Sequence, residues 1–292
     1  MAASEELHPK YRLGEGKLSI QHMKRKGATA MPRPHSHSSV ELYYLLDGER
    51  VYFVDGRVVT VRKGELILIA EGELHSTASS EVAEFERILI HYDRDVLPPS
   101  LRPLDLLAGE RRFRVFALTL RERAEAERIL RRMLEECSQA KPYYDACCQS
   151  LLAELVVLLG RCDRAPSANV PRDSLHHKVS EIASYLGEHY RESLTLEETA
   201  KRFFVSSSYL SRIFHRLTGF GFREYILHLR VREAQRLLAG TRMRMNEIAP
   251  AVGFEYLSHF NKAFKKATGL TPMQYRKQAK AGALRPEGQA ES

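Results

Sequence analysis

One pattern of apolar and small residues occurs twice in the C-terminal third of the chain. Residues 203–214 read FFVSSSYLSRIF, and fifty positions later residues 253–264 read GFEYLSHFNKAF. When the copies are aligned on the glycines that end them, Gly219 and Gly269, their apolar residues coincide. Because a duplicated pattern usually marks a duplicated supersecondary unit, we expect the same small helical unit twice.

Each copy has the signals of a helix, a tight corner and a second helix. In the first copy, Thr195 and Glu198 have the spacing of a capping box, and Ser206 is placed to cap the second helix. In the second copy, Arg244 stands where the first copy has its capping threonine, and Pro250 lies within the first helix, where it removes an amide donor. We therefore expect two helix-turn-helix units, with a kinked and poorly capped first helix in the second unit.

The second helix of each unit has an apolar face, which its spacing of three and four residues assigns to the core. The opposite face carries the chemistry needed to read base edges, since Arg and Lys donate to guanine, Asn pairs with adenine, and a helix fits the major groove. The outward positions that we expect to contact DNA are Ser207, Ser208, Ser211 and Arg212 in the first unit and Leu257, Ser258, Asn261, Lys262 and Lys265 in the second.

The excess positive charge lies entirely in the C-terminal part. The chain has 292 residues and a net charge of +8. From Pro171 onward there are 20 Lys and Arg against 12 Asp and Glu, whereas the first 170 residues hold 25 of each. A basic segment attached to a neutral one suggests that one half meets a polyanion. We expect double-stranded DNA to be that partner.

The last hundred residues resemble the DNA-binding domain of the AraC family of bacterial transcription regulators, in which a long helix joins two helix-turn-helix units. Here the joining helix would be FREYILHLRVREAQRLLAG, and the closing signature would be GFEYLSHFNKAFKKATGLTPMQYR. The matching residues of the joining helix are Tyr225, Leu229, Arg230, Ala234, Leu237 and Leu238. The resemblance implies base-reading positions at Ser207, Ser208, Ser211, Arg212, Leu257, Ser258, Asn261 and Lys262. We expect the first unit to supply more of the sequence discrimination.

The neutral half begins with strand signals. From residue 40 to 92 apolar and polar residues alternate, and glycines interrupt the pattern at short intervals. Asp47-Gly48 and Asp55-Gly56 are dipeptides typical of tight hairpins. Many short strands with such turns favour a small antiparallel barrel or sandwich.

Helical spacing replaces the strand pattern from about Arg121, and a second, more apolar helix follows Pro142. The second helix is apolar on more than one face, through Leu151, Leu152, Leu155, Val156, Leu158 and Leu159. Such a helix either packs deeply on its own domain or meets a partner chain, and we favour a partner, which predicts a homodimer.

Histidines before and between the strands have the spacing HxHxxxE with a later histidine, which resembles the cupin barrel that AraC-type regulators often carry as an effector domain. We expect a small-molecule effector pocket, with the candidate residues His35, His37, Glu41, Tyr43 and His75. Tyr43 is included because alternation places it on the same strand face as Glu41. By the same resemblance, His35, His37, Glu41 and His75 could instead hold one divalent metal ion; a closed barrel without any ligand is the third alternative.

Together these patterns predict an α+β multidomain protein. The expected parts are an N-terminal arm and cupin-like barrel (1–105), a helical hairpin for dimerisation (106–160), a linker (161–174), the double helix-turn-helix domain (175–277) and a tail (278–292), with fraying from Lys277 on.

For function, we expect a sequence-specific transcription activator that also contacts RNA polymerase. We expect it in the cytoplasm and not in a membrane, because the longest apolar stretch, LLAELVVLLG, is too short to span one and the start, MAASEELHPK, has no signal-peptide pattern. Two other functions compete: a metal-dependent cupin enzyme, such as a dioxygenase, with a helical appendage, and an architectural DNA-binding protein without an effector.

Overall fold

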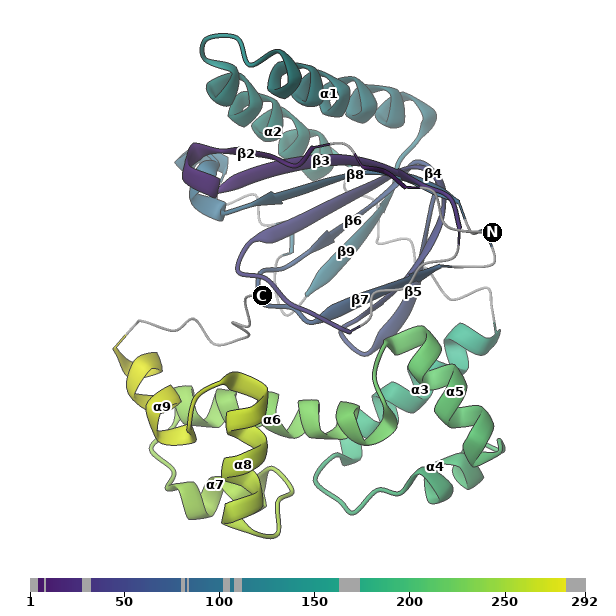
Figure 1. Ribbon diagram of the computed structural model, residues 1–292, viewed down its shortest axis with the longest axis vertical. Coiled ribbons are helices and arrows are strands. Elements are labelled where there is room, and N and C mark those ends of the chain that lie inside the picture. The colour runs from purple at the N-terminus through teal and green to yellow at the C-terminus, as the bar shows by residue number, and fades with distance from the viewer. Residues whose placement is uncertain are drawn as a thin grey trace.

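The computed structural model describes residues 5–7, 9–27, 33–79, 82, 84–101, 106–107, 112–162 and 174–281. These residues form an antiparallel β domain with two helices on one face and an all-helical domain on the opposite side (Figure 1). The predicted α+β multidomain fold is therefore confirmed. No helix within these ranges is long and apolar enough to cross a membrane.

The β domain consists of two layers that share one long strand, β4. In the larger layer the order is β1-β3-β8-β4-β6-β9, with β2 paired to β3. In the smaller layer, β5 and β7 pair with the C-terminal half of β4. The strands are β1 (Glu5–Leu7), β2 (Tyr11–Leu13), β3 (Leu18–Arg25), β4 (Val40–Val54), β5 (Arg57–Arg62), β6 (Glu65–Ile69), β7 (His75–Ser79), β8 (Phe85–Tyr92) and β9 (Phe113–Ala117). Short 3₁₀ turns are Gly14–Gly16, Arg94–Val96 and Pro99–Leu101.

The hairpin predicted at Asp47-Gly48 was wrong, because β4 runs through this pair without a break and its register with β8 shifts just before it. Gly48 has a φ of +86°, and a Cβ there would lie 2.2 Å from the carbonyl oxygen of Glu84. A bulge can use the same left-handed glycine as a turn, and it bends the strand instead of reversing it. The bend carries β4 from one layer to the other. The hairpin at Asp55-Gly56, between β4 and β5, is confirmed, with φ of 48° and 69°.

Alternation along the strands gives the larger layer two different faces. One face packs against α1 (Leu120–Gln139) and α2 (Tyr144–Arg161) in a single apolar core. The other face and the inner face of the smaller layer enclose a second core, which includes Tyr43, Tyr52 and Phe85. This second face is the interior of the β domain, and the candidate effector residues lie on it.

The helical hairpin is confirmed, but its apolar residues are covered mostly from within the chain. Of the α2 residues that suggested a partner, all but Leu158 are buried against the β domain or α1, and Leu158 is partly buried. Packing on its own domain, the alternative that we did not favour, thus accounts for the pattern. The boundary at residue 105 was also misplaced, since β9 lies beyond it and pairs with β6.

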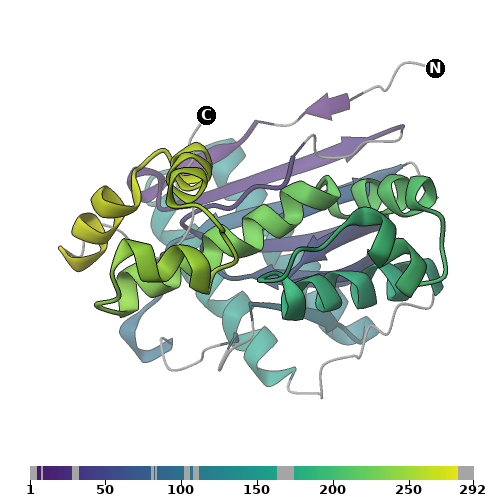
Figure 2. The ribbon, with the colours of Figure 1, turned by 90° about the horizontal axis from the view of Figure 1, so that it is seen from below.

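The helical domain has the expected order of elements. Its helices are α3 (Ser174–His189), α4 (Leu196–Arg202), α5 (Ser207–Thr218), α6 (Phe222–Gly240), α7 (Met245–Ala251), α8 (Leu257–Thr268) and α9 (Pro272–Lys280). Because α9 continues to Lys280, the fraying predicted from Lys277 was wrong for these residues. Most of the predicted linker, 163–173, and the end of the tail, 282–292, lie outside the described residues. Figure 2 shows α6 running from the first unit to the second.

The β domain packs on the first helix-turn-helix unit. Val51, Phe53 and Val58, which face outward from β4 and β5, share one apolar core with α3, α5 and α6. The Phe53 ring lies 5.6 Å from the ring of Tyr225 and 6.3 Å from that of Phe220, between centroids. The core of the second unit, formed by α6 to α9, includes no β-domain residue among those described.

Hydrogen bonds also cross the contact between the domains, and one of them joins the Thr60 hydroxyl to Nδ1 of His176 at 3.3 Å. The Ser76 hydroxyl donates to the carbonyl oxygen of Thr218 at the end of α5, at 2.7 Å. The Val58 amide donates to the Ser180 hydroxyl on α3, at 2.9 Å. The first unit is thus joined to the β domain by both apolar and polar contacts, and the second unit is reached through α6.

Candidate functional site

The first helix-turn-helix unit is closed by side-chain caps at both helix starts. The Thr195 hydroxyl oxygen accepts the Glu198 amide at 3.2 Å, and the Ser206 hydroxyl oxygen accepts the Tyr209 amide at 3.2 Å. The Glu198 carboxylate accepts a hydrogen bond from the Thr195 hydroxyl, not from the Thr195 amide. Of the predicted capping box, only the bond from the Glu198 amide to the Thr195 side chain is therefore formed. Gly219 ends α5 in the left-handed conformation, as expected. Three of the predicted signals therefore act where the sequence placed them.

The second unit is less well capped. Arg244 begins α7 without a side-chain cap, although its amide donates to the carboxylate of Glu247. Tyr256 stands at the start of α8 and also provides no side-chain cap. Pro250 lies one residue before the end of α7, so the amide it lacks belongs to the last turn of the helix. The predicted lack of a side-chain cap at the start of α7 is confirmed, and the missing cap at the start of α8 is an addition that the sequence did not predict.

The corners of the two units use different residues for one backbone conformation. Phe204 has a φ of +56° at the first corner, and Gly253 has a φ of +88° at the second. A Cβ on Gly253 would lie 2.8 Å from the Cα and carbonyl oxygen of Arg191, so the second corner has no space for a side chain. The first corner is open, and the Phe204 side chain is 93% exposed. Phe204 thus has a strained left-handed backbone, and no burial of its side chain offsets the strain.

We expect Phe204→Gly to raise the free energy of unfolding by about 1 kcal/mol, because glycine adopts a positive φ without the strain that a Cβ adds. Urea unfolding measures the change. The matched control is Phe204→Ala, which removes the ring and keeps the strained Cβ, and which should bring no gain. Equal stabilisation by both substitutions would show that the exposed ring and not the backbone is responsible.

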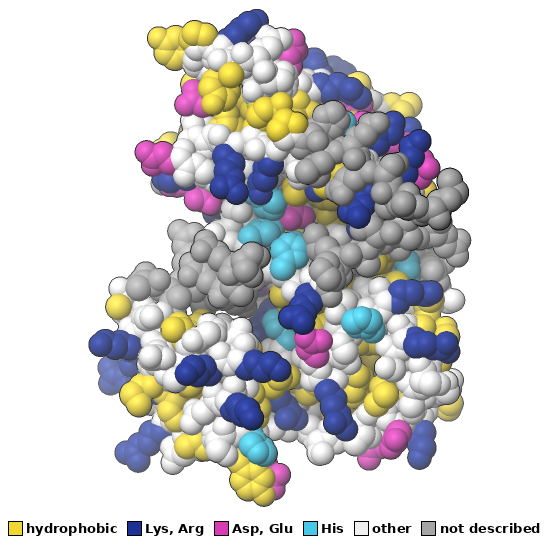
Figure 3. All heavy atoms as spheres, viewed as in Figure 1, with side chains coloured by type: hydrophobic (Ala, Val, Ile, Leu, Met, Phe, Trp, Pro, Cys, Tyr) yellow, Lys and Arg dark blue, Asp and Glu magenta, His cyan; other side chains and the backbone are white. Residues whose placement is uncertain are grey.

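The outward faces of the recognition helices α5 and α8 are accessible. Leu210, Phe214, Phe260 and Phe264 are buried in the cores of the two units. Ser207 is partly exposed, and the other predicted contact positions are exposed: Ser208, Ser211, Arg212, Leu257, Ser258, Asn261, Lys262 and Lys265. Figure 3 shows basic side chains over the helical half of the molecule. The domain contact therefore leaves both polar faces free.

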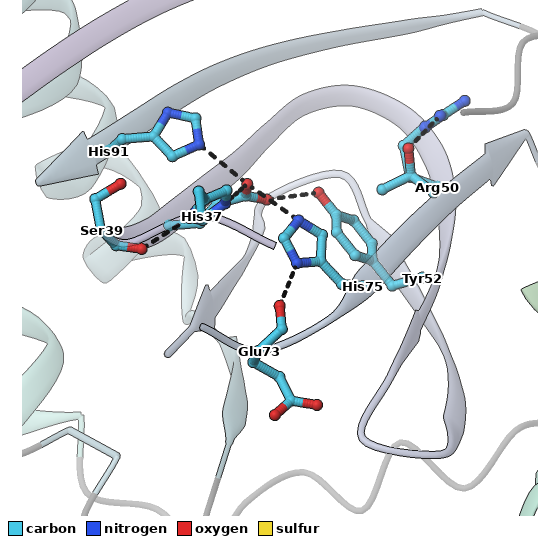
Figure 4. A network of polar contacts seen from close by, with 9 residues as sticks. His37, Ser39, Arg50, Tyr52, Glu73, His75 and His91 are labelled. Atoms are coloured by element: carbon cyan, nitrogen blue, oxygen red, sulfur yellow. Dashed lines mark hydrogen bonds and ion pairs between the residues drawn. The ribbon is translucent and has the colours of Figure 1, made fainter. Parts of the chain in front are cut away.

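The predicted effector residues meet in the interior of the β domain. The Glu41 carboxylate, 4% exposed, lies at the centre, with its Oε2 at 3.0 Å from His37 Nε2 and 3.4 Å from His75 Nε2. His35 pairs with His75 through two backbone hydrogen bonds of 3.0 Å, and their rings are 4.6 Å apart. His91 Nε2 also lies 3.2 Å from Glu41 Oε2 (Figure 4). These five residues are called the histidine cluster below.

Backbone carbonyls orient two rings of the histidine cluster. Nδ1 of His37 donates to the carbonyl oxygen of Ser39 at 2.8 Å, and Nδ1 of His75 donates to that of Glu73 at 2.9 Å. In the neutral form each ring therefore keeps its lone pair on Nε2, the nitrogen that faces Glu41. His75 Nε2 is buried and makes no well-directed hydrogen bond with a described residue. This is the arrangement in which proteins present histidine to a metal ion.

The electrostatics of the cluster favour a negative centre. Burial alone would raise the pKa of Glu41, but the charge of His75 and hydrogen bonds from neighbouring rings hold it well below its ordinary value. Burial acts to lower the pKa of His75, but the Glu41 carboxylate outweighs this effect, so the pKa of His75 is raised. Burial and the charge of His75 lower the pKa of His35 to about 4. At pH 7 the cluster thus combines an ionised carboxylate with a neutral imidazole at His35.

Sequence reasoning missed three residues that share this interior: His91, Arg87 and Arg50. The first two lie on β8, where alternation along RILIHY places them on the same face. The alternation showed that Arg87 and His91 share a face of β8, but it could not show which face of the strand lies in the interior. Tyr43 was correctly placed in the interior, 5.4 Å from Tyr52 between ring centroids.

Two family models match the chain, one for each domain. A model described as AraC-like ligand binding domain matches residues 26–156, and one described as Helix-turn-helix domain matches residues 199–278.

Relatives with curated names are regulators. The chain is 35% identical over 129 residues to the uncharacterized HTH-type transcriptional regulator YijO of Escherichia coli (strain K12), which covers 43% of this chain and 46% of that protein. It is 28% identical over 169 residues, 58% of each protein, to the HTH-type transcriptional activator RhaR of Shigella dysenteriae. The chain spans about half the length of these relatives.

Among solved structures, the C-terminal domain of AraT, a response regulator from Geobacillus stearothermophilus, is 36% identical with a TM-score of 0.35, over 36% of this chain and 88% of that one. The cupin-enzyme alternative finds no support in these relatives.

Proposed function

Since the chain belongs to the AraC family of transcription regulators, we propose that it binds specific DNA sequences and regulates transcription under the control of an effector in its β domain. The observation that carries the proposal is the pair of recognition helices, α5 and α8, whose polar faces stay exposed although the β domain packs on the first unit. The two helices would enter adjacent major-groove turns, about 34 Å apart, on one face of the duplex.

In this proposal, polar, basic and apolar side chains of α5 and α8 contact the bases. Arg212 and Lys262 would donate to guanine, Asn261 would pair with adenine, and Leu257 would contact a thymine methyl group. The first unit, whose helices are both capped, would give more of the discrimination. Footprinting on a bound promoter tests the arrangement. Two protected blocks one helical turn apart support it, and one continuous block that is the same on any sequence would favour an architectural protein.

The effector would act through the contact between the β domain and α5. His75 of the histidine cluster precedes Ser76, which donates to Thr218 at the end of α5. His35 follows Pro34, and a Cβ on Gly219 would lie only 3.2 Å from the Pro34 ring. Two short segments thus connect the cluster to the end of one recognition helix. An effector changes this contact only if it binds with different affinity to the protein with the contact formed and to the protein with the contact altered.

We further propose that the effector site includes one divalent cation, held by His35, His37, Glu41 and His75. Two overlapping groups, His35/His37/His75 and His37/Glu41/His91, have ligand atoms within 4.8 Å of one another. Imidazole nitrogens with a carboxylate suit zinc, iron, nickel or manganese. The buried Nε2 of His75, which has only a 3.4 Å contact with Glu41 Oε2 in place of a well-directed hydrogen bond, would gain a stronger partner in such an ion.

The expected stoichiometry is one divalent ion per chain after incubation and dialysis, measured by elemental analysis. His75→Ala should weaken the binding by more than about tenfold, because it removes a ligand. His177→Ala is the matched control, since this histidine is exposed on α3, and it should leave the stoichiometry unchanged. Full metal content in the His75→Ala protein would contradict the proposed ligands, and a metal-free wild type would leave the pocket to an organic effector alone.

Three further parts of the proposal concern partners and place. A homodimer through the helical hairpin would pair two such chains on one operator, with the partly buried Leu158 and its neighbours on α2 as the contact. An activator would also contact RNA polymerase. Such a regulator of a bacterial promoter would work in the cytoplasm, where the DNA is. Sedimentation of the purified protein with and without operator DNA tests the dimer.

A further inference from the structure

Two arginines and a tyrosine form a second polar group in the interior of the β domain, apart from the histidine cluster. Arg50 donates through Nη2 to the Thr77 hydroxyl at 2.9 Å, and its guanidinium lies 4.5 Å from the centre of the Phe85 ring. The Arg87 guanidinium lies 5.4 Å from the centre of the Tyr43 ring. We call Tyr43, Arg50 and Arg87 the arginine cluster.

The arginine cluster and the histidine cluster lie along one interior surface. Tyr52, two residues from Arg50 on β4, stacks at 5.4 Å from Tyr43 and donates to Glu41 at 3.4 Å. Figure 4 shows Tyr52 beside His75 with Arg50 on the other side. A single ligand in the interior could therefore touch both clusters.

Solvent reaches this interior along β3 and β8. Several interior-facing side chains of these two strands keep partial exposure, whereas Tyr43, Tyr52 and Arg50 on β4 are buried. The partly exposed residues are Gln21, Met23, Arg87, Leu89 and His91. The rest of the interior is lined by apolar residues of the same core: Leu45, Val54, Val61, Ile67, Ile69 and Phe85.

One polar atom of Tyr43 and one of Arg87 are buried without a well-directed hydrogen bond to the residues that the structure describes. Although Arg50 lies close enough to the Tyr43 hydroxyl to act on its pKa, this hydroxyl is buried and makes no well-directed hydrogen bond with a described residue. The same holds for Nη1 of Arg87, whose Nη2 reaches only Gln21 Oε1, at 3.4 Å. Burying a donor without an acceptor costs free energy, and more for a charged group. Such groups are kept where a ligand supplies the missing acceptor.

The charge around these atoms is positive. Burial raises the pKa of Tyr43 to about 12, and the nearby Arg87 and Arg50 act against this rise, so the phenol stays protonated at pH 7 and can donate. Burial, and then the charges of Arg12 and Arg87, lower the pKa of Lys10, which places a further cation near the opening. A neutral sugar would leave these charges without a counterion, whereas an oxyanion would accept from both the guanidinium and the phenol.

We infer that the effector is an organic anion, in which a carboxylate or phosphate group is bound by Arg87, Arg50 and the Tyr43 hydroxyl and an apolar body lies against the interior lining. This inference rests on the proposed effector site, and it adds the chemical class of the effector. It requires that binding depend on the negative charge of the ligand and on Arg87.

Thermal unfolding of the full chain with three matched probes tests the inference: phenylacetate, phenyl phosphate and the neutral phenylacetamide. At least one anion should raise the unfolding midpoint by roughly 2–4 °C at millimolar concentration, and the amide should not. The anion that acts tells carboxylate from phosphate. Arg87→Met should abolish the shift while its own midpoint stays equal to that of the wild type or rises, because it removes a partly buried charge whose Nη1 has no hydrogen-bond partner among the described residues. Arg131→Met, at an exposed position on α1, is the control for general ionic effects and should keep the shift.

Three results would overturn the inference: no shift with either anion, an equal shift with the amide, or a full shift in the Arg87→Met protein. Each is separable from failure of the proposed function. If the same preparation still selects specific DNA, only the anionic class of effector is wrong; if it binds all DNA alike, the regulatory function itself fails.

Discussion

Replacing Phe53 by Ala is expected to detach the helical domain from the β domain, at a cost of about 3–5 kcal/mol. The ring is 3% exposed and packs between the domains, against Phe220 and Tyr225 of the first unit. It lies on the outer face of the smaller layer and belongs to the core shared with the helices, not to the interior core of the β domain. The loss should therefore fall on the contact between the domains and leave each domain folded.

Calorimetry and hydrogen exchange together measure this effect. We expect the Phe53→Ala protein to unfold in separate transitions for the two domains, with faster exchange at the end of α5, near Thr218. Phe116→Ala is the matched control, because Phe116 is equally buried in the β domain but packs toward the helical hairpin. The control should lower the stability of the β domain and leave exchange in α5 unchanged. If both variants unfold in the same way, the domain contact is not the element that holds the first unit.

Replacing Arg212 by Ala is expected to cost about 1–3 kcal/mol of discrimination at a single base position, the value of a good bidentate contact to guanine. Arg212 is fully exposed on the polar face of α5, so its removal should not disturb the fold. Binding to the selected site and to variants changed at each base measures the effect. Arg223→Ala, at an exposed position near the start of α6, should leave discrimination intact. A uniform loss for all sequences would identify Arg212 as a phosphate contact instead.

The helical domain was predictable because its signals are local. Caps at Thr195 and Ser206 and the stop at Gly219 act within one turn of the backbone, and the three-and-four spacing identifies the buried face of each helix. The duplication made the pattern secure, since a chance match would not recur with the same core positions and the same closing glycine. The positive φ at each corner is also a local property, but which residue fits there depends on distant parts of the chain. Gly253 is required because the backbone of Arg191 leaves no room for a Cβ there, whereas the Phe204 side chain is exposed at the first corner.

The β domain was less predictable, since its geometry depends on which strands pair. Asp47-Gly48 has the sequence of a hairpin, and only the pairing of β4 with four other strands shows that it is a bend. In the histidine cluster, residues on three strands and a loop converge on Glu41. The resemblance to a family motif supplied four of them, while His91 could be found only once β8 was paired with β4. Arg50 and Arg87 had no motif at all, and they are recognised only from their places in the folded interior, beside Tyr43 and Phe85.

The two units of the helical domain are unequal in a way that has consequences for function. The first is capped at both helix starts and packs on the β domain, whereas the second lacks side-chain caps and is reached through α6. In the proposed mechanism, the first unit reads its half of the site from a position that the effector can alter. The second unit would add affinity and a second block of contacts. Variants in α5 should therefore reduce discrimination more than equivalent variants in α8.

The most direct test of the central claim is selection of bound DNA from a random pool by the full-length protein, followed by affinity measurements at physiological salt. The account predicts one enriched sequence with two conserved blocks about one helical turn apart, bound at least 10³-fold more tightly than random DNA. It also predicts that Arg212→Ala relaxes the block read by α5 and leaves the other block intact. Recovery of no enriched sequence, with equal affinity for selected and random DNA, would contradict it.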